Sequence, residues 1–165
     1  MIVVGDASAL IALHRVGGWD LLPRLYGEVH VPESVWQEVF SVPAFAARMP
    51  SAPGWLLRHA SPVAAPHSPD LDALDTGEAD AIRLAHSLPA DLLLIDEVRG
   101  RRVAQRLGLR ITGVVGLLIE AKRRGLIPSL AAALAKLKAQ DFWMSDRLVQ
   151  EALRLGGESE GGPQQ

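Results

Sequence analysis

The sequence predicts an α/β protein of three layers, with helices on both faces of a mostly parallel sheet of four to five strands. Two short apolar runs, at residues 2–4 and 92–95, each end at an aspartate and are followed almost at once by a helical pattern of apolar residues. Such a run feeding directly into a helix is typical of a buried parallel strand with its crossover. The alternation of strand and helix along the chain gives the fold class.

The remaining elements follow from apolar periodicity and from turn residues. Pro32 and Pro128 suit helix starts, and Gly17-Gly18 breaks the first helical pattern. Besides the helix from residue 7, helices are expected at about 19–25, 33–40, 76–87, 98–107, 114–124, 129–139 and 145–155, and further strands at 28–31, 55–59 and 108–112.

A proline-rich excursion at residues 41–75 interrupts this order. It holds six of the 11 prolines, so no long helix crosses it, and apart from one strand and a short helix near Phe45 it is predicted to be loop. Neither flank is complete alone, so residues 1–155 are predicted to form a single domain. The polar, glycine-rich residues 156–165 are predicted to be a disordered tail.

The composition is that of an ordinary globular domain. The 165 residues are 48% hydrophobic and 22% charged, and the absence of cysteine excludes disulfides, thiolate metal sites and cysteine nucleophiles. No apolar run approaches the roughly 20 residues of a membrane span, and no signal peptide is visible, so we expect a cytoplasmic protein. The net charge of −2 argues against a general nucleic-acid-binding face, although five arginines lie between residues 99 and 110.

Asp6 and Asp96 each follow a buried strand and precede a helix. Either aspartate could simply cap its helix, and Ser8 could cap the first one equally well. The carboxyl ends of parallel strands share one sheet edge, however, and open α/β sheets bind their ligands there. Glu97 is interpreted as a solvated neighbour or as an acid that complements the dipole of the first helical turn. The repeated arrangement favours a functional pair of carboxylates.

Glu78 lies in the middle of an apolar helical stripe. It shares this stripe with Ala81, Ile82 and Ala85, where an unpaired carboxylate is costly. The alternative is a capping box, in which Asp75 and Glu78 satisfy each other's backbone N–H groups. Asp80 falls on the opposite side and is expected to be solvated.

Carboxylates crowded at one edge would need a cation. Neighbouring carboxylates raise one another's pKa unless a cation neutralises their charge. A site with oxygen ligands and without sulfur or clustered imidazole suits Mg²⁺ or Mn²⁺. Such an ion supports hydrolysis of phosphodiesters by activating water. The sequence has no phosphate-binding glycine loop and no nucleophile elbow.

Several segments, taken in order, resemble the PIN-domain superfamily. They are VVGDASAL (3–10), VPESVWQE (31–38), GEADAI (77–82) and LLIDE (93–97). Residues 100–104 and 108–116 are similar to a poorly characterised prokaryotic branch that lies near the VapC-like toxin ribonucleases. The resemblance covers residues 2–155.

The resemblance implies a PIN-like fold and a Mg²⁺- or Mn²⁺-dependent endoribonuclease. The implied catalytic carboxylates are Asp6, Glu38, Glu78 and Asp96, of which Asp6, Glu78 and Asp96 hold the metal. Ser8 and Arg101 are implied to contact the substrate. Glu38 rests on the resemblance alone, because it lies off the centre of its helix's apolar face.

The implied partners are RNA, an antitoxin protein that would block the acidic groove, and a second copy of the chain in a homodimer. The alternative function is a catalytically silent PIN-like module that binds RNA or a protein. A receiver-like phosphoacceptor or a haloacid-dehalogenase-like phosphatase ranks last, since Ala7 and Ser8 stand where a second acid would be needed. The excursion at 41–75 is longer than in minimal toxins and could cover the groove.

Overall fold

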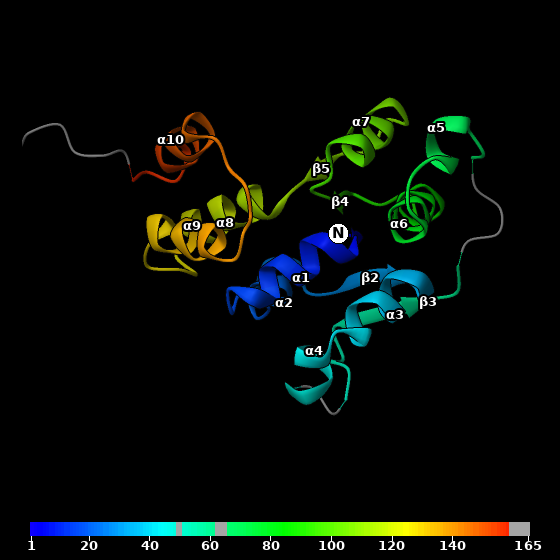
Figure 1. Ribbon diagram of the computed structural model, residues 1–165, viewed down its shortest axis with the longest axis horizontal. Coiled ribbons are helices and arrows are strands. Elements are labelled where there is room, and N and C mark those ends of the chain that lie inside the picture. The colour runs from blue at the N-terminus through cyan, green and yellow to red at the C-terminus, as the bar shows by residue number, and fades with distance from the viewer. Residues whose placement is uncertain (49–50, 62–65, 159–165) are drawn as a thin grey trace, which may run out of the picture.

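Five parallel strands form one sheet in the computed structural model, which describes residues 1–48, 51–61 and 66–158. The order of the strands in the sheet is β3 (Leu56–His59), β2 (Val29–Pro32), β1 (Val3–Gly5), β4 (Leu92–Leu94) and β5 (Ile111–Thr112). The chain therefore builds outward from β1 to β3, then returns to the other side of β1 for β4 and β5 (Figure 1). The strand order reverses between β1 and β4, and such a switch point is where open sheets of this kind bind ligands.

Helices cover this sheet and complete the three predicted layers. They are α1 (Ala7–Arg15), α2 (Leu21–Tyr26), α3 (Glu33–Ser41), α4 (Pro43–Arg48), α5 (Pro69–Asp72), α6 (Thr76–Ser87), α7 (Val98–Arg106), α8 (Val114–Arg123), α9 (Leu130–Ala139) and α10 (Asp146–Leu155). α1 and α6 lie on either side of the central strands, and α8 to α10 pack together at one end of the molecule (Figure 1). None of the described helices is long and apolar enough to cross a membrane.

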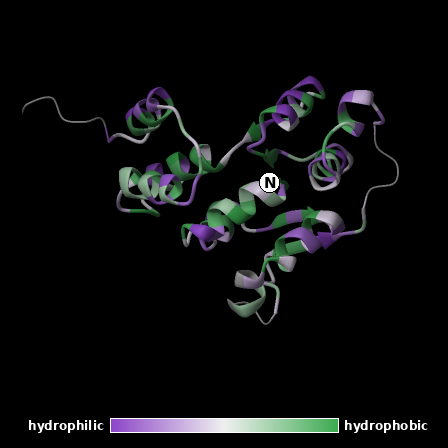
Figure 2. Cartoon of the chain, viewed as in Figure 1, coloured by the Kyte–Doolittle hydropathy of each residue, from purple (hydrophilic) through white to green (hydrophobic). Residues whose placement is uncertain are grey.

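The pairing of β1 with β4 brings the ends of these strands together. Val4 pairs with Leu93 and Gly5 with Leu94, and the Asp6 N–H donates to the Leu94 carbonyl at 3.0 Å. Gly5 suits this position because a Cβ would lie 3.3 Å from Val29 and 3.4 Å from Leu10. These contacts are tight, so a side chain here would press against Leu10 of α1. The central strands β1 and β4 and most of α1 are hydrophobic, whereas α7 mixes hydrophilic and hydrophobic residues (Figure 2).

Most element bounds agree with prediction to within about three residues, and the short helix near Phe45 is confirmed as α4. The loop predicted before Asp75 is wrong at α5. Ser68 accepts a hydrogen bond from the Leu71 N–H at 3.2 Å, and Pro69 occupies the first helical turn, where a missing N–H costs little. The fully buried Leu71 side chain anchors this turn to the core.

Glu158, which lies within the segment predicted as a tail, contacts the start of α9. The Glu158 carboxylate accepts hydrogen bonds from the backbone N–H groups of Leu130 and Ala131, at 2.6 and 2.9 Å, and pairs with Lys122 at 3.0 Å. An anion at the start of α9 is favourable because these N–H groups have no partner within the helix. The remainder of the predicted tail, 159–165, lies outside the described residues.

Asp80 is buried, so the expectation that it is solvated is wrong. Only 7% of its surface is exposed. The Ser34 hydroxyl donates to Asp80 at 2.7 Å, and the Arg83 guanidinium lies 3.3 Å away. Asp80 thus ties α6 to α3 as a satisfied structural carboxylate.

Candidate metal and substrate site

Asp6 lies directly after β1 and caps α1. Its carboxylate accepts a hydrogen bond from the Ser8 N–H at 3.3 Å, and only 2% of the residue is exposed. Burial raises the pKa of Asp6 from 3.8 to about 7, and the negative charges of Glu78 and Asp75 add to this rise. The N–H groups of Ala7 and Ser8 act in the opposite direction. A helix cap alone does not require such burial beside other acids.

Glu78 projects from the first turn of α6 into the same interior. It is 5% exposed, and its Oε1 atom is buried without a hydrogen-bond partner among the described residues. Burial, followed by the charges of Asp75 and Glu97, raises its pKa to about 7. Asp75 does cap α6, since it accepts from the Glu78 N–H at 2.9 Å. The cap therefore forms, yet the Glu78 side chain is left with an unsatisfied buried oxygen, as a ligand-binding group would be.

Gly100 allows the Glu78 carboxylate to approach α7. A Cβ at residue 100 would overlap Oε1 of Glu78 and lie 2.7 Å from Cδ1 of Ile95. The Gly100 backbone N–H also lowers the pKa of Glu78, against the effect of burial. The absence of a side chain at this position is thus needed for the close approach of α6 to α7.

We expect Gly100→Ala to destabilise the protein by roughly 1–2 kcal/mol, because overpacking outweighs the gain in helix propensity. Urea denaturation measures this change. Gly54→Ala is the matched control, since a Cβ there would meet nothing within 4 Å. In a Glu78→Ala protein, Gly100→Ala should lower the free energy of unfolding by less, because the Cβ no longer overlaps the Glu78 carboxylate. An equal loss in both proteins would contradict this contact.

Asp96 follows β4 and reaches the start of α8. Both carboxylate oxygens accept from the Val114 N–H, at 3.1 and 3.3 Å. Burial raises the pKa of Asp96, whereas the Val114 N–H and the Arg101 charge lower it. Arg101 donates from Nη1 to the Ile95 carbonyl at 2.9 Å, beside Asp96. Arg101 is thus engaged with the strand end, and its implied contact with substrate stays a prediction.

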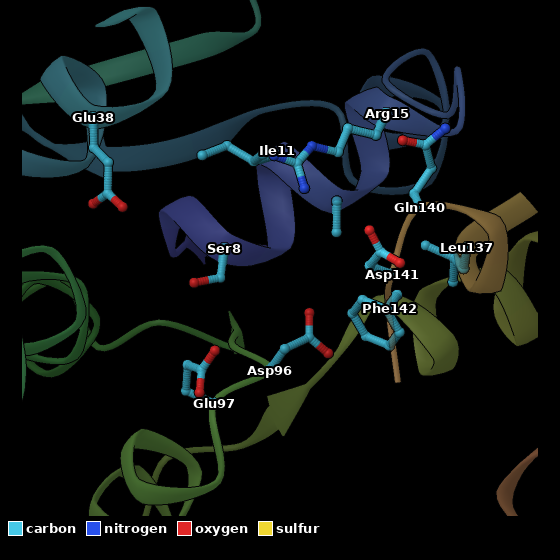
Figure 3. A pocket seen from close by; sticks show the side chains of 11 residues that line it. Ser8, Ile11, Arg15, Glu38, Asp96, Glu97, Leu137, Gln140, Asp141 and Phe142 are labelled. Carbon is cyan, nitrogen blue, oxygen red and sulfur yellow. The ribbon is translucent and has the colours of Figure 1, made fainter. Parts of the chain in front are cut away.

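Ser8, Glu38, Asp96 and Glu97 line one side of a cavity of about 230 Å³. Figure 3 shows Ser8 between Glu38, which comes from α3, and Asp96. Partial burial and the Asp75 charge raise the pKa of Glu38, although the residue remains largely exposed. The residue implied only by resemblance therefore faces the same cavity as Asp96.

The predicted acids gather at one sheet edge in two linked groups. Asp6 and Glu78 lie in the buried interior and repel each other, while Glu38 and Asp96 border the cavity. Two acids connect the groups electrostatically: Asp75 raises the pKa of Asp6, Glu78 and Glu38, and Glu97 raises those of Glu78 and Asp96. As placed, no three His, Cys, Asp or Glu side chains in the described part of the chain are close enough to hold one metal ion jointly.

Sequence reasoning missed Asp75 and Glu97 as members of the site. Each was given an ordinary role, a helix cap for Asp75 and a solvated neighbour for Glu97. Their one visible signal was position, since Asp75 precedes Glu78 by three residues and Glu97 follows Asp96 directly.

The parallel sheet and the carboxylates near its switch point are typical of open α/β proteins, which bind their ligands at the carboxyl ends of the strands. The chain belongs to the PIN-domain family, whose model matches residues 2–158. A solved structure of a PilT N-terminus domain protein from the hyperthermophilic archaeon Sulfolobus solfataricus P2 has the same fold, with a TM-score of 0.50 and 16% identity over 73% of this chain and 93% of that one. No curated protein is significantly similar in sequence.

Proposed function

We propose that this protein is a Mg²⁺- or Mn²⁺-dependent endoribonuclease. The observation that carries the proposal is the buried pair Asp6 and Glu78, both with a pKa raised to about 7, at the switch point of the sheet. Buried carboxylates with raised pKa values are characteristic of functional sites. Membership of a family of nucleases supports phosphodiester hydrolysis as the chemistry.

The chemistry of the donors suits a hard divalent cation, although no three of the described acids are close enough, as placed, to share one. Glu78 presents a buried oxygen that has no hydrogen-bond partner in the described part of the chain, and Asp6 and Glu78 repel each other, so a cation would relieve both costs. Carboxylate oxygens are the ligands that Mg²⁺ and Mn²⁺ prefer. Asp6, Glu78 and Asp96 would hold the ion, which would supply Lewis acidity and an activated water.

The remaining side chains have separate tasks in this proposal. The Val114 N–H fixes the orientation of Asp96, and together with Arg101 it favours the ionised carboxylate against the effect of burial. Glu38 and Glu97 border the cavity into which the substrate phosphate would enter, and the Ser8 hydroxyl can donate to a phosphate oxygen there. Ionised acids around an RNA phosphate require a counter-charge, so cleavage should depend on added metal.

One observation favours a catalytically silent module as the second candidate. The described acids do not converge in threes at the distances of metal ligands. In that case the acidic edge would bind an RNA or protein partner without hydrolysis. A toxin-like role, an antitoxin partner, a homodimer and a cytoplasmic location are retained as proposals that rest on the resemblance.

Calorimetric titration with Mn²⁺, paired with cleavage of a mixed RNA pool, tests the proposal. We expect Mn²⁺ to bind at micromolar to millimolar concentration and EDTA to stop cleavage. Glu78→Gln should weaken Mn²⁺ binding by about tenfold or more, since it removes one charged ligand. Absence of both binding and cleavage would favour the silent module.

A further inference from the structure

The cavity beside Asp96 continues away from the acids to a second group of side chains. Its other walls come from α1 and from the turn between α9 and α10 (Figure 3). Residues on this side are Ile11, Ala12, Arg15, Leu137, Gln140, Asp141 and Phe142. A molecule bound at Asp96 and Glu97 can therefore extend along the cavity without leaving the protein surface.

Arg15 supplies a positive charge in this otherwise acidic cavity. Its side chain runs back along α1 towards Ile11, and the guanidinium points into the cavity rather than away from it (Figure 3). Arg15 makes no hydrogen bond or ion pair with any described residue, whereas Arg83, Arg106, Arg124 and Arg154 each pair with an acid. An unpaired guanidinium offers a planar fork of donors that matches phosphate.

The walls around Arg15 suit a nucleoside. Ile11 and the ring of Phe142 are apolar and half-buried, Leu137 is apolar and buried, and an aromatic face is a platform for an unstacked base. Gln140 and Asp141 add an amide and a carboxylate that can bond base edges. Asp141 has a φ of 60°, in the left-handed region that aspartate tolerates better than most residues, and this φ shapes the turn carrying these groups.

We propose that Arg15, Gln140 and Phe142 form a subsite for the nucleotide adjacent to the scissile phosphate of a single-stranded RNA. Arg15 binds its phosphate, Phe142 stacks on its base and Gln140 contacts the base edge. The inference rests on the proposed nuclease function and adds to it the residues that would hold an unstacked base, which single strands offer and duplexes do not. The subsite also explains how a chain of net charge −2 can hold RNA.

Fluorescence anisotropy with a short labelled single-stranded RNA tests this subsite. Kd is measured in EDTA for the parent protein, and in Mn²⁺ for the Asp96→Asn protein, so that the RNA is not cleaved in either buffer. Arg15→Ala should raise Kd about tenfold and reduce the salt dependence by about one phosphate contact. Phe142→Leu, which keeps an apolar side chain in place, should raise Kd about fivefold. Arg110→Ala is the matched control, since Arg110 is exposed and precedes β5 at the opposite sheet edge.

The outcomes separate this inference from the nuclease proposal. Equal Kd values for Arg15→Ala and Arg110→Ala would overturn the subsite even if cleavage is observed. So would the absence of RNA binding both by the parent protein in EDTA and by the Asp96→Asn protein in Mn²⁺. Binding that depends on Arg15 without any cleavage would sustain the subsite and reject the nuclease. Equal affinity for a duplex of the same sequence would overturn the stacking role of Phe142.

Discussion

Asp96→Asn is expected to lower RNA cleavage by at least about 100-fold without unfolding the protein. The amide oxygen can still accept from the Val114 N–H, which is the contact that holds residue 96 at the start of α8. The negative charge is lost, however, and with it the ability to hold a cation or to orient a metal-activated water. Initial rates on a labelled RNA in Mn²⁺ measure the effect, and circular dichroism checks the fold.

Asp20→Asn serves as the matched control for this change. Asp20 is an exposed acid before α2, and its side chain makes no capping hydrogen bond. Its replacement should leave the rate within about twofold of the parent. An Asp96→Asn protein that is folded and fully active would reject the proposed site. Glu38→Gln tests a second acid that lines the same cavity, and about a tenfold loss of the cleavage rate is expected.

The main features of the fold could be predicted because they depend on local patterns. The runs at 2–4 and 92–95 are too short and too apolar for anything but buried strands, and each leads straight into a helix. The switch point then follows from strand order, which places Asp6 and Asp96 at one edge. α5 was missed because four residues are too few to show a helical period, and the burial of its Leu71 against the core is a tertiary contact that the local sequence does not reveal.

The site was predictable only in part, because acids of one type serve different purposes. Glu78 could be recognised from its apolar stripe, which makes burial visible in the sequence. Asp80 is buried just as deeply, but its partners Ser34 and Arg83 satisfy it, and Ser34 comes from another helix. Periodicity cannot report such a partner, and it also cannot show that the α9–α10 turn closes the cavity beside Asp96.

The buried acids should also make stability depend on pH and metal, and Asp6→Asn tests this. Asp6 and Glu78 have folded-state pKa values of about 7, above their ordinary values of 3.8 and 4.5. At a pH between the unfolded and the folded pKa values, Asp6 and Glu78 are ionised in the unfolded chain but protonated in the folded protein. In EDTA, the free energy of unfolding therefore falls as pH rises from about 4 to 7. Since one pKa unit corresponds to about 1.4 kcal/mol, the loss by pH 8 amounts to a few kcal/mol.

Asp6→Asn should therefore be more stable than the parent at pH 8 in EDTA, and its stability should fall less between pH 5 and 8. The other shifted groups are present in both proteins, so the comparison isolates Asp6 and its coupling to Glu78: Glu33, Glu158 and His30 have lowered pKa values, and Glu38 and Asp96 have raised ones. Mn²⁺ should restore stability to the parent at pH 8 and have little effect on the variant, as urea midpoints would show. The expectation is contradicted if the free energy of unfolding of the parent does not change between pH 5 and 8, or if it changes equally in the variant. Either result would mean that ionisation of Asp6 does not destabilise the metal-free protein.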